Sequence, residues 1–238
     1  MARAQLIRVS IYVASGLAVL TLAIGLLHTP LGRPLLARLG VGCPVQASPE
    51  DVERARLRSA RATQGSELSP AQPALGFKLD GMTQQDVKAW ADREHVSCDD
   101  LRSGSLLLCK NVPESALGGR TGTPIDELEL AFSPTSKRLV NIATTRYGLD
   151  GNVAATQMSN VVASLEEQLG KPTSDVGERT GSFLSSGPMR TALVRYRFTD
   201  YQADVTATNL PGKGVMLREH YMSARDEVTA TTKTTMND

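Results

Sequence analysis

The chain is poor in the residue types that most often build active sites and metal centres. Its 238 residues include only three histidines, three cysteines, one tryptophan and four phenylalanines. No two histidines stand at the spacing of a zinc site, so the sequence predicts no metal centre. Because large aromatic side chains are so rare, we expect an aliphatic core.

Signatures of common enzyme classes are also missing. There is no nucleophile elbow, and the glycine-rich run 118–122 lacks the Lys-Ser/Thr pair of a phosphate-binding loop. The adjacent acids at 99–100 and at 166–167 would point apart on a strand or a helix, so neither forms a carboxylate dyad. The sequence predicts a non-catalytic protein without a small-molecule cofactor. A hydrolase with a cryptic triad is the less favoured alternative.

Neither sign of charge is in excess. The chain has 26 basic residues against 25 acidic ones, a net charge of +1. Such a balance lacks the electrostatic footprint of a general nucleic-acid binder. We therefore expect no nucleic-acid partner.

One long uncharged stretch stands out, residues 9–27. As a helix its 19 residues would reach about 28 Å, close to the ~30 Å hydrocarbon core of a bilayer. The stretch predicts an uncleaved transmembrane signal anchor at 9–28, in contact with the lipid bilayer, after a cytoplasmic stub at 1–8. Two alternatives remain, a cleaved secretory signal and a lipoprotein signal that ends at Cys43.

The basic residues flanking this stretch suggest an orientation. Arg3, Arg8 and the amino terminus give a slight positive excess on the N-terminal side over Arg33 and Arg38. The predicted location is the inner (cytoplasmic) membrane, crossed once, with an extracytoplasmic, periplasmic C-terminal domain.

The remainder of the chain divides into four predicted parts. A linker spans 29–74 and carries a polar helix near 49–63. Two α+β repeats occupy 75–148 and 151–222, and residues 223–238 form a disordered tail.

Each repeat shows a helix pattern followed by strand patterns. Thr83 and Asp86 can form a capping box at the first helix. The second helix, 152–169, places Met158 and Leu165 on one apolar face. Three extended segments follow each helix. The predicted fold class is α+β, a transmembrane helix and then two tandem helix-plus-three-strand units with antiparallel sheet.

Two short motifs of the chain are GMTQQDV at 81–87 and LELAFSPTSKRLVNI at 128–142. Both resemble segments of the SmpA/OmlA (BamE-like) group of small envelope lipoproteins. The tandem arrangement over 75–222 also resembles the β-lactamase-inhibitor-protein fold. The resemblance implies a non-catalytic, protein-binding character.

Two of the three cysteines are candidates for a disulfide. Cys98 and Cys109 close a short loop that an oxidising compartment could bridge, and the alternative is a pair of buried free thiols. Cys43 would be left over in either case.

A basic surface is predicted on one strand. Arg195 and Arg197 alternate with apolar residues, so they project from the face opposite the core, and Arg190 and Arg218 could extend this surface. It is either a solvated sheet face or a partner-facing surface for an acidic protein or lipid headgroups.

These observations together predict a function. We expect a membrane-anchored extracytoplasmic module of the cell envelope that binds or scaffolds another envelope protein. The alternative is a secreted inhibitor or binding protein released by signal cleavage.

Overall fold

The computed structural model describes residues 48–118 and 123–225 of the chain. The chain divides after Ser48 into two units, and the fold described below belongs to the second. The predicted stub at 1–8, the predicted anchor at 9–28 and Cys43 lie outside the described residues.

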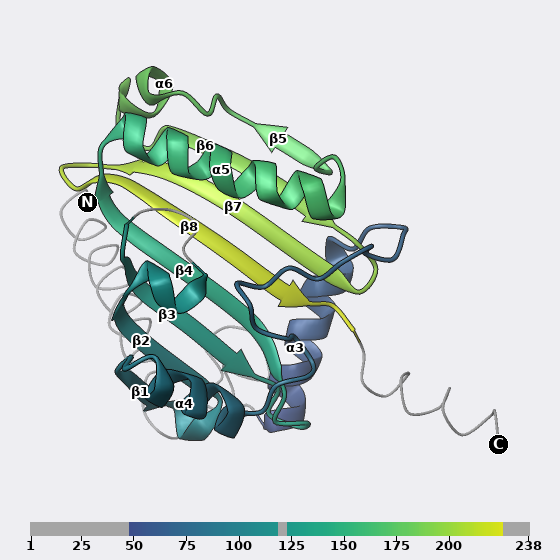
Figure 1. Ribbon diagram of the computed structural model, residues 1–238. Helices are drawn as coiled ribbons and strands as arrows, with labels where there is room; N and C mark the ends of the chain where they lie inside the picture. Colours follow the sequence, from purple (N-terminus) through teal and green to yellow (C-terminus); the bar gives the residue numbers. More distant parts are fainter. Residues whose placement is uncertain (1–47, 119–122, 226–238) are drawn as a thin grey trace, which may run out of the picture. The chain divides into compact units, whose positions relative to one another are not determined.

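A single antiparallel sheet forms the centre of the fold (Figure 1). Its strand order is β1-β2-β3-β4-β8-β7-β6-β5, so the last strand of each half, β4 and β8, meet in the middle. The strands are β1 (Cys98–Leu101), β2 (Leu106–Val112), β3 (Ile125–Phe132), β4 (Leu139–Leu149), β5 (Ser174–Val176), β6 (Thr191–Arg197), β7 (Tyr201–Leu210) and β8 (Gly214–Ser223).

The two main helices, α4 and α5, lie on the same face of this sheet, α4 over the β1 end and α5 over β7 and β8 (Figure 1). The helical elements are α3 (Pro49–Ala62), α4 (Gln84–Arg93), α5 (Gly151–Leu169), α6 (Gly181–Ser185) and the short 3-10 helices η1 (Arg102–Gly104) and η2 (Glu114–Leu117).

Local sequence signals explain where the helices begin and end. The predicted capping box of α4 is confirmed, because Thr83 and Asp86 exchange side-chain to backbone hydrogen bonds. The predicted face of α5 is confirmed as well, since Met158 and Leu165 are both at most 1% exposed. Gly170, with a positive φ of 78°, follows the last turn of α5.

The prediction of two helix-plus-three-strand units is wrong. Each half contributes four strands, and the pairing of β4 with β8, for example Ile142 opposite Tyr221, joins all eight into one sheet. The strands missed from the sequence are the short edge strands β1 and β5. Their residues are exposed or half-buried, so no alternation of buried and exposed side chains marks them.

One hydrophobic core runs beneath both helices. It extends from Leu107 on β2 to Tyr196 on β6 without a break at the centre of the sheet. The hydroxyl of Tyr196 donates a hydrogen bond to the carbonyl of Val162 on α5. The core side chains on the same face of the sheet as Tyr196 therefore point towards the helices. We call this the covered face of the sheet.

Helix α3 packs on the other face, which we call the open face. Gln202 neighbours the core residue Ala203 on β7 and therefore points away from α5. Its side-chain amide donates to the carbonyl of Ala60, which is fully buried, at 2.7 Å. Arg56 adds a hydrogen bond to the carbonyl of Ser223 at the end of β8.

The expectations of a transmembrane signal anchor and of a single-pass inner-membrane location require correction. Within residues 48–118 and 123–225, no helix combines the length and the apolar character needed to cross a bilayer. Since the stretch 9–27 lies outside the described residues, the structure supports neither expectation.

Candidate functional site

The two central strands carry charged residues on the covered face. On β4, Arg146 has the same strand parity as the buried Ile142. On β8, Glu219 lies between the buried Leu217 and Tyr221 in the same parity. The pairing of β4 with β8 therefore brings an arginine and a glutamate together under the helices.

Arg146 and Glu219 form a buried ion pair. The Nη1 of Arg146 lies 2.8 Å from Oε1 of Glu219, and the two side chains are 3% and 2% exposed. Tyr221 donates its hydroxyl hydrogen bond to the other carboxylate oxygen of Glu219. Thr144 adds a longer contact of 3.4 Å to Oε1. Both oxygens of Glu219 thus have partners, as a buried carboxylate requires.

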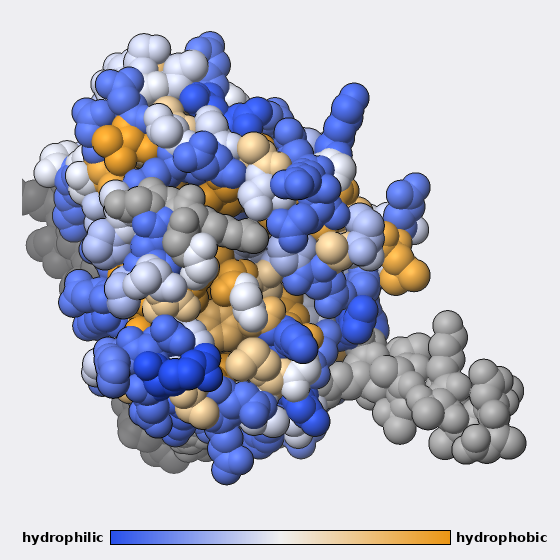
Figure 2. Space-filling model, viewed as in Figure 1, coloured by the Kyte–Doolittle hydropathy of each residue, from blue (hydrophilic) through white to orange (hydrophobic). Residues whose placement is uncertain are grey.

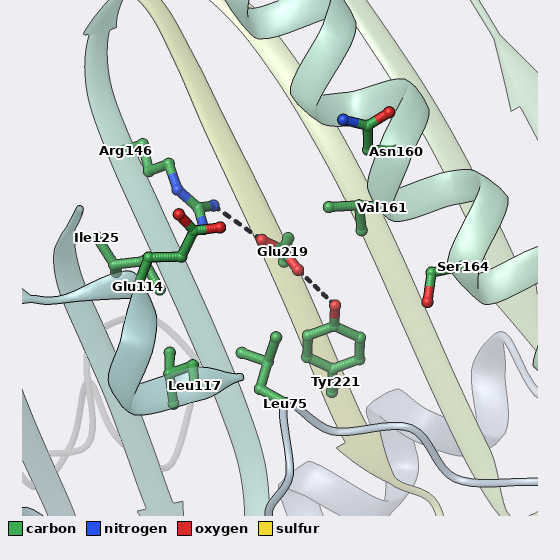
Figure 3. Close-up of a pocket in the computed structure, with 10 residues that line it drawn as sticks. All are labelled: Leu75, Glu114, Leu117, Ile125, Arg146, Asn160, Val161, Ser164, Glu219 and Tyr221. Atoms are coloured by element: carbon green, nitrogen blue, oxygen red, sulfur yellow. Dashed lines mark hydrogen bonds and ion pairs between the residues drawn. The ribbon is translucent and has the colours of Figure 1, made fainter. Parts of the chain in front are cut away.

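A cavity of about 120 Å³ lies above this ion pair (Figure 3). Its floor is formed by β4 and β8, and its walls come from η2, from the segment before α4 and from α5. Apolar side chains provide much of the lining, and the ion pair with three further polar side chains completes it. The lining consists of Leu75, Leu117, Ile125, Val161 and Tyr221, the ion pair Arg146 and Glu219, and the polar Glu114, Asn160 and Ser164.

The cavity lies beside α5, with η2 and the segment before α4 on its other side. Figure 2 shows apolar side chains at the surface between α4 and α5, within a rim of hydrophilic ones. A second, wider hollow of about 410 Å³ lies on the α4 side and shares Leu75 and Leu117 with the first. There the rings of Phe77 and Trp90 meet edge to face at 4.8 Å.

Glu114 is the polar wall residue with the least satisfied side chain. Pro113, which cannot donate a backbone hydrogen bond, precedes η2, and Gly118 at a φ of 84° follows it, so the local sequence sets both ends of this short helix. The Oε1 atom of Glu114 is buried and has no hydrogen-bond partner among the described residues. This carboxylate faces the same cavity as the buried ion pair (Figure 3).

The predicted basic surface is divided by acidic residues. Arg197 pairs with Asp204 at 2.6 Å, and Arg195 lies 4.0 Å from the same carboxylate. Arg218 lies 3.9 Å from Glu129. These arginines are on the open face, but they form a mixed-charge surface.

The fourth predicted residue, Arg190, lies outside the open face of β6. It precedes the strand, and its guanidinium carbon is 5.6 Å from the ring centre of Phe183. Arg190 therefore contacts an aromatic ring, whereas the other three arginines lie beside acidic side chains.

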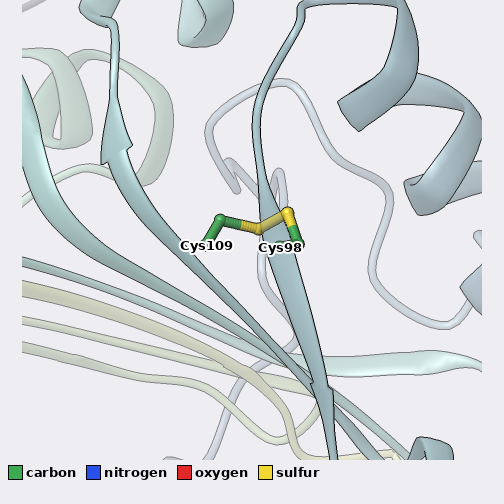
Figure 4. Close-up of a disulfide and its surroundings, with 2 residues drawn as sticks. All are labelled: Cys98 and Cys109. Atoms are coloured by element: carbon green, nitrogen blue, oxygen red, sulfur yellow. A yellow bond between two sulfur atoms is a disulfide. The ribbon is translucent and has the colours of Figure 1, made fainter.

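The two candidate disulfide cysteines stand directly opposite each other on β1 and β2 (Figure 4). Cys98 and Cys109 are joined by a disulfide with a Cα–Cα distance of 3.9 Å. The bridge ties the edge strand β1 to the sheet, and Cys109 is fully buried on the covered face.

The residues of the cavity were not identified from the sequence, although a signal for two of them was present. Arg146 and Glu219 each stand at a core position of a strand, and their charges are opposite. Two such residues in separate strands indicate a buried pair, because an unpaired charge would be too costly there. Glu114 gave no comparable signal, since its role depends on the packing of η2.

The search for metal ligands and the comparisons with known proteins complete the description of the site. No group of three or more histidine, cysteine, aspartate or glutamate side chains that could hold a metal ion occurs in the described part of the chain. No protein-family model, no curated protein and no solved structure matches this chain significantly. The resemblance to the SmpA/OmlA group therefore stays a prediction from two short motifs.

Proposed function

We propose that this chain is a non-catalytic module that binds another protein at the cavity between η2 and α5. The size of the cavity carries the proposal. At about 120 Å³ it is smaller than the roughly 300–1,000 Å³ of typical small-molecule pockets. It is close to the ~150 Å³ of an engineered cavity that holds benzene, so a single protruding side chain fits.

The surroundings of the cavity support a protein as the partner. Apolar side chains within a hydrophilic rim lie at the surface between α4 and α5 (Figure 2). Protein interfaces have this arrangement, with an apolar centre that anchors one or two side chains and a polar border. The buried ion pair below gives the cavity a fixed floor, because both oxygens of Glu219 are already hydrogen-bonded.

The chemistry of the lining supports a non-catalytic role. Glu219 is bound by Arg146 and Tyr221, so its carboxylate is not available as a general base. Ser164 accepts a hydrogen bond from Gln168 at 3.3 Å, and neither a histidine nor a carboxylate is bonded to it in the described residues. The resemblance to the SmpA/OmlA group supports the same conclusion.

Site-specific photo-crosslinking of the full-length chain in its native cells tests this proposal. A photoreactive residue replaces Asn160 in the lining of the cavity, and the matched control replaces Ala163, which is exposed on α5 and does not line the cavity. We expect a discrete protein adduct from position 160 and none from 163. Filling the cavity with Ser164→Phe should remove the adduct while thermal unfolding shows an intact fold. Equal adducts from both positions, or an adduct that survives the filled cavity, would contradict the proposal.

A further inference from the structure

The charges around the cavity do not balance within its described lining. Glu114 and Glu219 contribute two carboxylates, and Arg146 contributes one guanidinium. Arg146 is committed to Glu219 by their 2.8 Å contact. The proton of the Tyr221 hydroxyl is directed at Glu219 as well. One negative charge, that of Glu114, is therefore left to face the cavity.

One buried oxygen makes this half-buried carboxylate an acceptor site. Oε1 of Glu114 is buried, and no described residue donates to it. A buried acceptor without a donor is destabilising, and a charged one more so than a neutral one. A positively charged donor that enters the cavity would supply both the missing hydrogen bond and the missing charge.

The shape and apolar walls restrict which cation fits. Leu75, Leu117 and Val161 form walls that suit a chain of methylene groups. Lysine and arginine combine such a stem with a charged end, and they commonly bury the stem along apolar surface. The volume of about 120 Å³ admits one such group.

We propose that the cavity is a specificity subsite for a cationic side chain, lysine or arginine, of the bound protein, with Glu114 as its acceptor. This inference rests on the proposed function and adds the chemistry that the partner must present. Glu114 binds the charged end, and the apolar walls contact the stem. Arg146 and Glu219 form the floor and keep their own pairing.

Small analogues of the two side chains test the subsite in the full-length chain. Butylguanidinium and butylammonium are compared with neutral butylurea by NMR, using the methyl signals of Leu75, Leu117 and Val161. We expect millimolar binding of at least one cation, at least tenfold tighter than that of butylurea. Equal affinities for the cations and for butylurea would overturn the proposal.

Substitutions at Glu114 test its role as the acceptor. Glu114→Gln should bring the cation down to the affinity of butylurea, and Glu114→Asp should retain part of the preference. Continued butylurea binding shows that the cavity is intact in both variants. The charge-matched control, Glu178→Gln on an exposed loop, should change nothing. An unaltered cation preference in Glu114→Gln would overturn the assignment.

Crosslinking in the Glu114→Gln background separates this inference from the proposed function. We expect the adduct from position 160 to weaken at least fivefold. If the adduct persists at full strength, the protein-binding proposal stands and the cationic subsite is wrong. If position 160 gives no adduct in the unmodified chain, both are overturned.

Discussion

Glu219 on β8 and Asp204 on β7 lie on neighbouring strands but on opposite faces of the sheet. Glu219 stands opposite Val205, and Asp204 stands opposite His220. On the covered face, Glu219 is 2% exposed and pairs with one arginine at 2.8 Å. On the open face, Asp204 is 26% exposed and pairs with Arg197 at 2.6 Å. The first acid depends on partners inside the dry core, of which Arg146 is the cation, whereas solvent shares in satisfying the second.

The open-face acid also has further basic side chains nearby. Arg195 and His220 lie 4.0 Å and 3.9 Å from its carboxylate. Burial alone would raise the pKa of Asp204, but the neighbouring His220 and the pairing with Arg197 outweigh it and lower that pKa. The difference teaches that the contribution of an arginine to stability cannot be read from the sequence until the face of the sheet on which it lies is known. The same charge is a structural necessity on one side and a minor contribution on the other.

The largest effect is expected from breaking the covered-face pair. Arg146→Met leaves Glu219 buried without its cation, so the free energy of unfolding should fall by about 3–5 kcal/mol. Urea denaturation at neutral pH measures it. The double variant Arg146→Met with Glu219→Leu removes both charges and should recover much of the loss. A double variant as unstable as the single one would show that packing, and not the unpaired charge, sets the cost.

The second-largest effect is expected from removing the disulfide between Cys98 and Cys109, which also lies on the covered face. Cys98→Ser opens the loop of sequence separation 11 and should lower the free energy of unfolding by about 3 kcal/mol on a chain-entropy estimate. Thermal unfolding with and without reductant measures it. The variant and the parent should melt together once reductant is present, and a persistent difference would assign the loss to packing.

A smaller and pH-dependent effect is expected on the open face. Folding lowers the pKa of Asp204, so its ionised carboxylate stabilises the folded state. This contribution to the free energy of unfolding is complete above the ordinary pKa of 3.8. It is lost as the pH falls through the folded-state pKa. Asp204→Asn should cost about 1 kcal/mol at pH 7. That cost should shrink towards zero near pH 3, measured by urea denaturation across the range. A cost that stays constant with pH would show that the carboxylate charge is not its source.

The smallest effect is expected from Arg218, which shares the open face. Its side chain and that of Glu129 are 45% and 44% exposed and 3.9 Å apart. Arg218→Met should therefore change the free energy of unfolding by less than about 1 kcal/mol. The same denaturation assay at low and at high salt checks this. A loss comparable with that of Arg146→Met would remove the contrast between the two faces.

Part of the fold follows from the sequence because it is encoded locally. The capping box of Thr83 and Asp86 and the apolar face of α5 each depend on residues within a few turns of one another. The pairing of Ile142 with Tyr221 joins residues far apart in the chain, and no local pattern specifies it. The edge strands escaped prediction because they have almost no buried face.

The surroundings of the open-face arginines and the cavity followed from the sequence even less. Arg195 and Arg197 were visible as an alternating pair, but the partner that neutralises them, Asp204, lies on another strand. Glu114 faces the cavity because η2 forms one of its walls. A site assembled from six separate segments requires the tertiary arrangement to be known.

The bridge between Cys98 and Cys109 has a consequence for the solubility of the protein. β1 has four residues and β5 three, so each end of the sheet offers other chains only a short row of free backbone groups. Without the bridge, β1 could detach and leave β2 as the outermost strand. β2 has seven residues, beginning with three consecutive leucines, and such an edge is a template for intermolecular strand pairing. Reduction would then convert a protected border into a site for ordered self-association.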